Sequence, residues 1–240
     1  MKFATYMGTL IMGLVLGALL LPGRFKKTAE KTVETENVTL NMLGSITGEK
    51  FPFKKVIAET SGSLILELTE SDQPLLDFIE ASALAVSTQL SQPDSPAREK
   101  RRINEVSALF EDALRILIDG HPDFSCDFPE TKAGKIQRSG YPDLRVEHLP
   151  TGSLAYLDPK IFEEKSIKSS FRTFYFEPSQ KNTKITENAL HLLIGFPHDG
   201  KTREWTFGKP HLVDLSNLTV KLKTEFAASN KDLYSRHLKE

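Results

Sequence analysis

The chain has 240 residues, of which 39% are hydrophobic and 26% charged, and this balance excludes a disordered or fibrous protein. Its 31 Lys and Arg residues are offset by 32 Asp and Glu residues, so the protein as a whole presents no cationic field to nucleic acid, and a polyanion must find a local patch. The single cysteine, Cys126, excludes an internal disulfide framework and a cysteine-rich metal site. We expect Cys126 to be a small core side chain.

The first 27 residues are expected to form a signal peptide or a membrane anchor. Residues 3–22 carry no charge, and the chain turns basic directly afterwards. A helix of about 20 such residues would span a hydrocarbon core of ~30 Å, although Lys2 also provides the short positive region of a secretory signal. The absence of an Ala-x-Ala site favours an uncleaved anchor. We therefore expect a membrane-anchored or exported protein of the cell envelope, with the membrane as a partner through residues 3–22 and with its sidedness open.

Residues 28–60 are expected to be a polar linker between this segment and the folded body. They are rich in Thr, Glu and Lys and alternate only weakly between polar and apolar side chains. The folded domain is expected over residues 61–240, because a chain of this length has room for one substantial core.

Two amphipathic helices are predicted in the first half of that domain. Over residues 71–90, apolar side chains recur every three or four positions behind a Ser/Asp cap. The second helix is predicted over 95–120, with Ser95 as its N-cap, Pro96 in its first turn and Gly120 at its end.

Short strands are predicted after the second helix. The runs DFSCDF, DLRVEHL, SLAYLDPKIF, SFRTFYFEP and HLLIGF are separated by Gly, Pro, Ser and Asn residues. The end of the chain predicts one or two further strands and a helix from about Lys223 onward. This order of elements predicts an α/β (α+β) fold with a central mixed, largely antiparallel sheet flanked by helices.

Two acids and a lysine are predicted to meet in one hairpin of this sheet. If YPDLRVEHL and GSLAYLDPKIF pair, Asp143 at the start of one strand lies beside Asp158 near the end of the other. The two-residue period of a strand places Asp158 and Lys160 on the same face. Pro159 between them cannot donate to a ladder, which predicts a sheet edge or a local distortion at this point.

Converging carboxylates repel each other unless a cation lies between them, and a hard divalent ion such as Mg²⁺ or Mn²⁺ is the natural partner. A lysine beside a metal-bound water can stabilise hydroxide, orient the water or neutralise charge on a pentavalent phosphorane. The trio therefore predicts hydrolysis of a phosphodiester.

The hairpin resembles the active site of the PD-(D/E)xK nuclease superfamily. Pro142-Asp143 matches the PD, Asp158-Pro159-Lys160 matches the (D/E)xK, and the apolar run before Asp158 matches the strand between them. The resemblance implies a restriction endonuclease-like fold and Mg²⁺-dependent cleavage of nucleic acid, DNA before RNA.

The resemblance also implies that a preceding helix supplies a further glutamate. Glu105 is the first choice for this acid, with Glu111 and Glu99 as alternatives. In this hypothesis Asp143, Asp158 and Glu105 bind the metal and Lys160 assists the attacking water.

Basic residues just downstream are candidates for contacts to a nucleic-acid backbone, namely Lys165, Lys168 and Arg172. Simpler interpretations stay open. Asp143 also fits a β-turn, and Asp158 with Lys160 also fits a surface ion pair. Two alternative functions remain as well: a catalytically inactive nuclease-fold binding module at the cell envelope, and a sheet-based interaction domain unrelated to nucleases.

Overall fold

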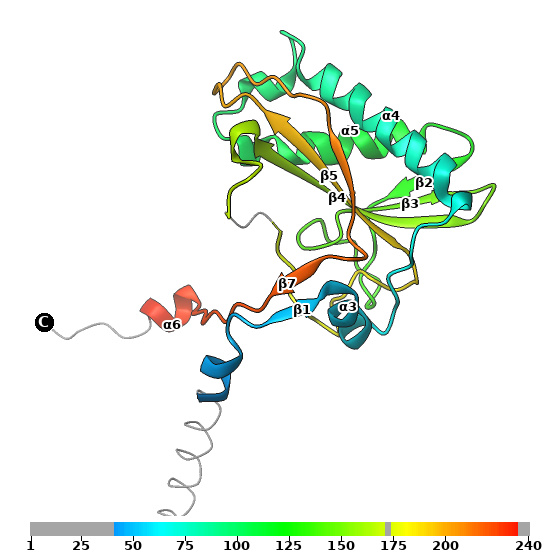
Figure 1. The fold of residues 1–240 in the computed structure, drawn as a ribbon. Coiled ribbons are helices and arrows are strands. Elements are labelled where there is room, and N and C mark those ends of the chain that lie inside the picture. The colour runs from blue at the N-terminus through cyan, green and yellow to red at the C-terminus, as the bar shows by residue number, and fades with distance from the viewer. Residues whose placement is uncertain (1–40, 171–173, 235–240) are drawn as a thin grey trace, which may run out of the picture. The chain divides into compact units, whose positions relative to one another are not determined.

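A computed structural model of the chain describes residues 41–170 and 174–234 (Figure 1). The chain divides into two compact units, a first unit of Met1–Lys50 with Lys221–Glu240 and a second unit of Phe51–Val220. The expected signal peptide or anchor at residues 1–27 lies outside the described residues. Among the residues that the structure describes, no helix is both long enough and apolar enough to cross a membrane.

The described part of the first unit contains few regular elements. Residues 41–46 are helical, and the backbone groups of Gly48 and Glu49 exchange hydrogen bonds of 2.8 Å with those of Leu222. The helix expected from about Lys223 onward is present, within the described residues, as the short helix α6 (Asn230–Tyr234). Strands β1 (Lys50–Pro52) and β7 (Thr219–Lys221), most of whose residues belong to the second unit, form a two-stranded sheet.

A five-stranded sheet in the order β2-β3-β4-β5-β6 organises the second unit. Its strands are β2 (Phe124–Asp127), β3 (Leu144–His148), β4 (Ser153–Glu163), β5 (Leu190–His198) and β6 (His211–Asp214). Neighbouring strands run antiparallel except β4 and β5, which run parallel. Together with the flanking helices, this confirms the predicted α/β (α+β) fold with a mixed, largely antiparallel sheet.

The two faces of this sheet pack in different cores, and a pair of long helices covers one of them (Figure 1). Helices α4 (Gln73–Leu90) and α5 (Ser107–Asp119) pack on one face, in a core that includes Leu144, Val146 and Leu157 of the sheet. On the opposite face, α3 (Phe53–Ser61) contributes to a second core that includes Tyr156. The alternation of side chains along β3 and β4 thus divides the unit into two layers of packing.

The first predicted helix forms with nearly the expected bounds. A 3-10 turn, η1 (Glu70–Asp72), precedes α4, and Thr69 and Asp72 form a capping box around the turn. Pro74 lies in the first turn of α4. The N–H that proline lacks would have no acceptor within the helix at this position, so the residue is tolerated there.

The second predicted helix is shorter than expected. The segment 95–106 forms two 3-10 turns, η2 (Pro96–Glu99) and η3 (Ile103–Glu105), and only Ser107–Asp119 is α-helical. Ser95 still acts as a cap, since its Oγ accepts a hydrogen bond from the Ala97 N–H at 3.2 Å. The backbone at Lys100 is extended, with ψ 133°, and this breaks the helical hydrogen-bond ladder between the two turns.

Two other expectations differ from the structure. The expected linker at 28–60 contains β1 and most of α3, and Phe53 and Ile57 are fully buried because they supply the apolar side of that helix. The strand expected around SFRTFYFEP is absent from its described part, Ser170 and residues 174–178, which is irregular. Phe174 and Phe176 there pack against the second core, so their apolar character reflects burial without strand pairing.

Pro159 lies in the central strand β4, a position that prolines usually avoid. The backbone N–H of Asp143 donates to the Leu157 oxygen at 3.2 Å, and β3 pairs with β4 no further than Leu157. Because backbone groups two residues apart point the same way, the Pro159 nitrogen faces the side on which β3 has already ended. The predicted edge therefore exists locally, and it begins where the two acids lie.

Candidate active site

The pairing of β3 with β4 brings Asp143, Asp158 and Lys160 together. Leu144 opposes Leu157, so Asp143 falls beside Asp158, one step beyond the paired residues. Lys160 Nζ donates to Asp158 Oδ1 at 2.8 Å and to Asp143 Oδ2 at 3.2 Å. The convergence that the sequence predicted is thus present as one hydrogen-bonded trio.

Burial makes Asp158 the most constrained member of the trio. Its side chain is 1% exposed, and among the described residues its Oδ2 atom has no hydrogen-bond partner. Burial and the neighbouring Asp143 carboxylate raise the pKa of Asp158 to about 7, although Lys160 opposes the shift. A cation at the free oxygen would favour the ionised form of this carboxyl group.

Lys160 remains protonated at this position. Burial by itself would lower the pKa of its ammonium, but the carboxylates of Asp158 and Asp143 outweigh burial and raise it. The side chain is 30% exposed, so the ammonium is also reachable from outside the protein. It can therefore donate hydrogen bonds to an anionic ligand at neutral pH.

Among the helix acids, Glu111 is the one that acts electrostatically on the trio. Glu111 lies on α5, and burial raises its pKa, while the charges of Asp143 and Lys160 both reach it. Glu105 instead lies in η3, is exposed, and accepts a hydrogen bond from the Arg101 N–H at 3.3 Å. Glu99, the other alternative, is exposed in η2.

Arg138 connects Glu111 to the loop that leads into Asp143. Its guanidinium contacts Glu111 Oε2 at 3.0 Å and Asp112 Oδ1 at 3.1 Å, and it lies over the ring of Phe128 at 4.4 Å from the centroid. These contacts hold the loop against the first turns of α5, which explains how a helix on the apolar face of the sheet can present an acid near the trio.

Sequence reasoning missed Lys184. The side chain is 3% exposed, and its Nζ donates to the Gln137 carbonyl at 3.1 Å. Burial lowers the pKa of its ammonium, and the charges of Asp143, Asp158 and Glu111 oppose that shift. No local pattern marks Lys184, because it lies outside the hairpin and is brought close by the packing of the segment before β5.

A buried pair lies on the same face of the sheet as the trio. Tyr141 Oη and His191 Nδ1 are 2.7 Å apart, and His191 lies directly opposite Tyr156 in the register of β4 and β5. Burial lowers the pKa of His191 to about 3, so this imidazole is neutral. The sequence singled out none of its histidines for such a role.

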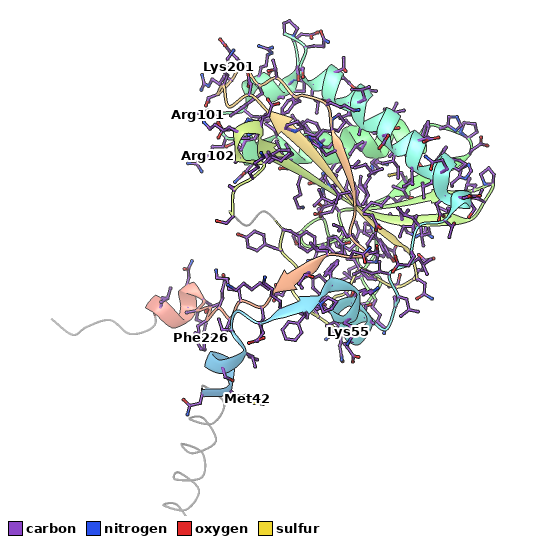
Figure 2. The ribbon with its side chains drawn as sticks, in the orientation of Figure 1. Met42, Lys55, Arg101, Arg102, Lys201 and Phe226 are labelled. Carbon is purple, nitrogen blue, oxygen red and sulfur yellow. The ribbon has the colours of Figure 1, made fainter. Side chains whose placement is uncertain are left out.

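The basic residues proposed for backbone contacts are only partly described. Lys165 is 79% exposed in its side chain and contacts Glu163 at 2.6 Å, and Lys168 is exposed. Arg172 lies outside the described residues. Figure 2 shows another basic group, Arg101, Arg102 and Lys201, at one end of the second unit, where Trp205 Nε1 donates to the Lys100 carbonyl at 3.2 Å.

The donor set fits a small hard cation bound partly by water. No group of three or more His, Cys, Asp or Glu side chains in the described part of the chain is arranged to hold a metal ion by itself. The carboxylates of Asp143 and Asp158 nevertheless both contact Lys160, and within the described part of the chain the buried Asp158 Oδ2 atom has no hydrogen-bond partner. Mg²⁺ takes one or two carboxylates and keeps several waters, so two protein ligands are sufficient.

Comparison with known proteins points in the same direction as this geometry. The profile of the type II restriction enzyme MjaV family matches residues 46–237. The chain is also 29% identical over 218 residues to the type II restriction enzyme MjaV of Methanocaldococcus jannaschii, a match that covers 85% of this chain and 93% of the relative. No solved structure matches the chain.

This match corrects the expected location of the protein. A membrane-anchored or exported protein was predicted from the apolar run at residues 3–22 alone, and those residues lie outside the described part of the chain. The similarity to a restriction enzyme over 85% of the chain overturns that prediction and gives no support to a membrane partner. Composition misled here because an apolar run of about 20 residues has the length of a membrane span, whatever its role.

Proposed function

Because the chain belongs to the type II restriction enzyme MjaV family, we propose that it is an endonuclease that hydrolyses phosphodiester bonds of DNA with Mg²⁺ or Mn²⁺. The observation that carries the proposal is the convergence of Asp143 and Asp158 on Lys160, at 3.2 and 2.8 Å. The family match covers residues 46–237, whereas the convergence is a local feature of the fold, so the two lines of support are different in kind.

Asp143 and Asp158 are the residues that would hold the metal. A bound divalent ion supplies positive charge to the phosphate and acidifies a bound water. The protein contributes a buried carboxylate in Asp158, whose raised pKa means that cation binding and proton release are coupled. Metal binding is therefore expected to strengthen as the pH rises through about 7.

Lys160 is the residue proposed to act on the reacting phosphate and water. Its ammonium stays charged beside two carboxylates and is partly exposed, so it can donate to a phosphate oxygen as negative charge develops there. The same donor can orient the attacking water. Because two hydrogen bonds already hold the lysine side chain before substrate arrives, the side chain loses little conformational freedom when substrate binds.

Glu111 is proposed as the third acid in place of Glu105. Its charge interacts with Asp143 and Lys160, and its contact with Arg138 sets its position. Glu105 has no such interaction among the described residues, where its contact is with the Arg101 backbone.

The two alternative functions lack comparable support. The family of the chain is described as one of restriction enzymes, which gives no support to a catalytically inactive module at the cell envelope. A sheet-based interaction domain unrelated to nucleases has no reason to bury an acid such as Asp158 beside a second carboxylate and a lysine.

The proposal is tested by digestion of plasmid and phage DNA with the full-length chain and with its Asp143→Asn variant. We expect the wild-type protein to give discrete fragments with Mg²⁺ or Mn²⁺, none with EDTA, and far slower cutting of RNA of the same sequence. The variant should not cut above background. Failure of the wild-type chain to cut any DNA, or equal cutting by both proteins, would overturn the proposal.

A further inference from the structure

A cavity of about 680 Å³ opens beside the trio, on the same face of the sheet. Arg145 and Tyr156, which line it, oppose each other in the register of β3 and β4. Arg145 lies two residues after Asp143, and Tyr156 lies two residues before Asp158. Since two residues of a strand advance about 7 Å and restore the same face, the cavity lies one such repeat from the acids.

Two chain segments form the walls of this cavity. One wall is contributed by residues between 127 and 136, and the other by Lys184, Thr186 and Glu187. The walls are joined, because the backbone N–H of Lys132 donates to the Thr183 oxygen at 2.8 Å. Tyr156, at the floor of the cavity, is joined to the second wall as well, since its Oη accepts a hydrogen bond from the Thr186 N–H at 3.0 Å.

The charged lining of the cavity is balanced and its donors are already positioned. The acids Asp127, Glu130 and Glu187 face an equal number of cations, Lys132, Arg145 and Lys184. The Arg145 guanidinium contacts Glu187 at 2.7 Å and Glu147 at 3.0 Å. A balanced lining of this kind does not select a phosphate group, which would require an excess of cations.

The remaining lining is uncharged and combines apolar side chains with the hydroxyl groups of Thr131 and Thr186. Phe128 and Ile136 contribute apolar surface, Ile136 is 67% exposed, and Tyr156 lies fully buried beneath them. A ligand that suits such a site is planar and uncharged and has hydrogen-bond donors and acceptors on its edges. The volume lies within the ~300 to 1,000 Å³ typical of pockets for small ligands.

We propose that this cavity receives one nucleobase of the DNA, close to the bond that is cut. The inference rests on the proposed nuclease function and adds to it a pocket for a single unstacked base. Extrusion of a base from a duplex costs a few kcal/mol, and apolar contact together with hydrogen bonds to the edges of the base offsets that cost. Lys184 lines the cavity, and its charge interacts with those of Asp143 and Asp158, so it relates the cavity to the site of cleavage.

The test first fills the cavity with a larger side chain and then removes single bases from the DNA substrate. Thr186 is an exposed lining residue, so Thr186→Trp adds bulk without disturbing the core, and Thr88→Trp on α4 is the matched control on the opposite face. On the cleaved sequence, Thr186→Trp should slow cutting at least tenfold, and Thr88→Trp should leave the rate within twofold of wild type. When an abasic nucleotide is placed at each position in turn, the Thr186→Trp defect should disappear at one position.

A binding measurement separates this inference from the proposed function. With Ca²⁺ in place of Mg²⁺, 2-aminopurine at the same position should brighten on binding wild-type protein and not on binding Thr186→Trp. If the wild-type chain cuts nothing, the probe is placed in the sequence enriched by binding selection. An increase in 2-aminopurine emission in that sequence would support base binding in the cavity even though the nuclease proposal had failed. The proposal that the cavity binds a base is overturned if emission is unchanged at every position. It is also overturned if the Thr186→Trp defect persists at every abasic position.

Discussion

The two faces of the hairpin β3–β4 have opposite character. On one face, Leu144, Val146, Ala155 and Leu157 are all fully buried in the core beneath α4 and α5. On the other face, the same two strands carry Arg145, Tyr156, Asp158 and Lys160, and Asp143 lies at the end of β3. The hairpin thus stabilises the domain with one face and holds the proposed chemistry on the other, since a strand alternates between them at every residue.

The polar face is held together by the apolar one. Asp158 is buried beside Asp143, and one of its oxygens has no hydrogen-bond partner among residues 41–170 and 174–234, an arrangement that disfavours its ionised form. Burial on the apolar face contributes roughly 1.5 to 3 kcal/mol for each large side chain, which offsets such local costs. Substitutions on the polar face should therefore change activity more than stability, and those on the apolar face should do the reverse.

The largest effect is expected from Lys160→Met. Loss of the ammonium should slow single-turnover cleavage by about 10³-fold, because a positioned charge or proton donor contributes roughly 10² to 10⁴. Lys209→Ala, an exposed lysine next to the Gly208 backbone that contacts α4, is the control and should cut within twofold of wild type. A Lys160→Met protein with more than a tenth of the wild-type rate would remove Lys160 from the mechanism.

The opposite face is tested by Leu157→Ala. Truncation of this fully buried side chain should lower the free energy of unfolding by about 2 to 5 kcal/mol in urea titrations. Cleavage per folded molecule should stay within about threefold of wild type. Leu84→Ala, at a leucine that is 50% exposed on α4, should cost less than about 0.5 kcal/mol. Equal losses in the two variants would contradict the division of the hairpin into two faces.

A smaller effect should distinguish the helix acids. Glu111→Gln removes a charge that reaches Asp143 and Lys160, so cleavage should slow by about 10 to 100-fold, with a higher Mg²⁺ concentration needed for half-maximal rate. Glu105→Gln should have the weaker effect, and Glu80→Gln on α4 serves as the surface control. A larger loss for Glu105→Gln would restore the original prediction from the sequence.

The pH dependence of stability without metal is also expected to change. The pKa of Asp158 is raised from 3.8 to about 7, so between these values the folded protein holds a proton that the unfolded chain releases. In EDTA, wild-type stability should fall as the pH rises across this window, by up to about 1.4 kcal/mol per pH unit, and level off above it. Asp158→Asn should flatten the profile, as measured by Tm from pH 4 to 8. Superimposable profiles would contradict the raised pKa.

Several features could be predicted from the sequence because they depend on neighbours along the chain. The hairpin brings Asp143 to Asp158 across a short turn, and the strand period places Lys160 on the same face as Asp158. The mixed, largely antiparallel sheet followed from the same alternation of apolar and polar residues. The apolar run at residues 3–22 shows the limit of such patterns, since it led to an expected location that the family match overturned.

The rest was decided by tertiary packing. Glu111 and not Glu105 interacts with the trio because the helix begins only at Ser107 and Arg138 ties its first turns to the loop before Asp143. The charge of Lys184, in the segment before β5, interacts with those of the acids, and the cavity forms between residues far apart in the chain. A sequence records the order of side chains and their local period, so it determined the hairpin and its trio. The distances between separate elements depend on how their apolar faces pack, and only the folded structure supplies them.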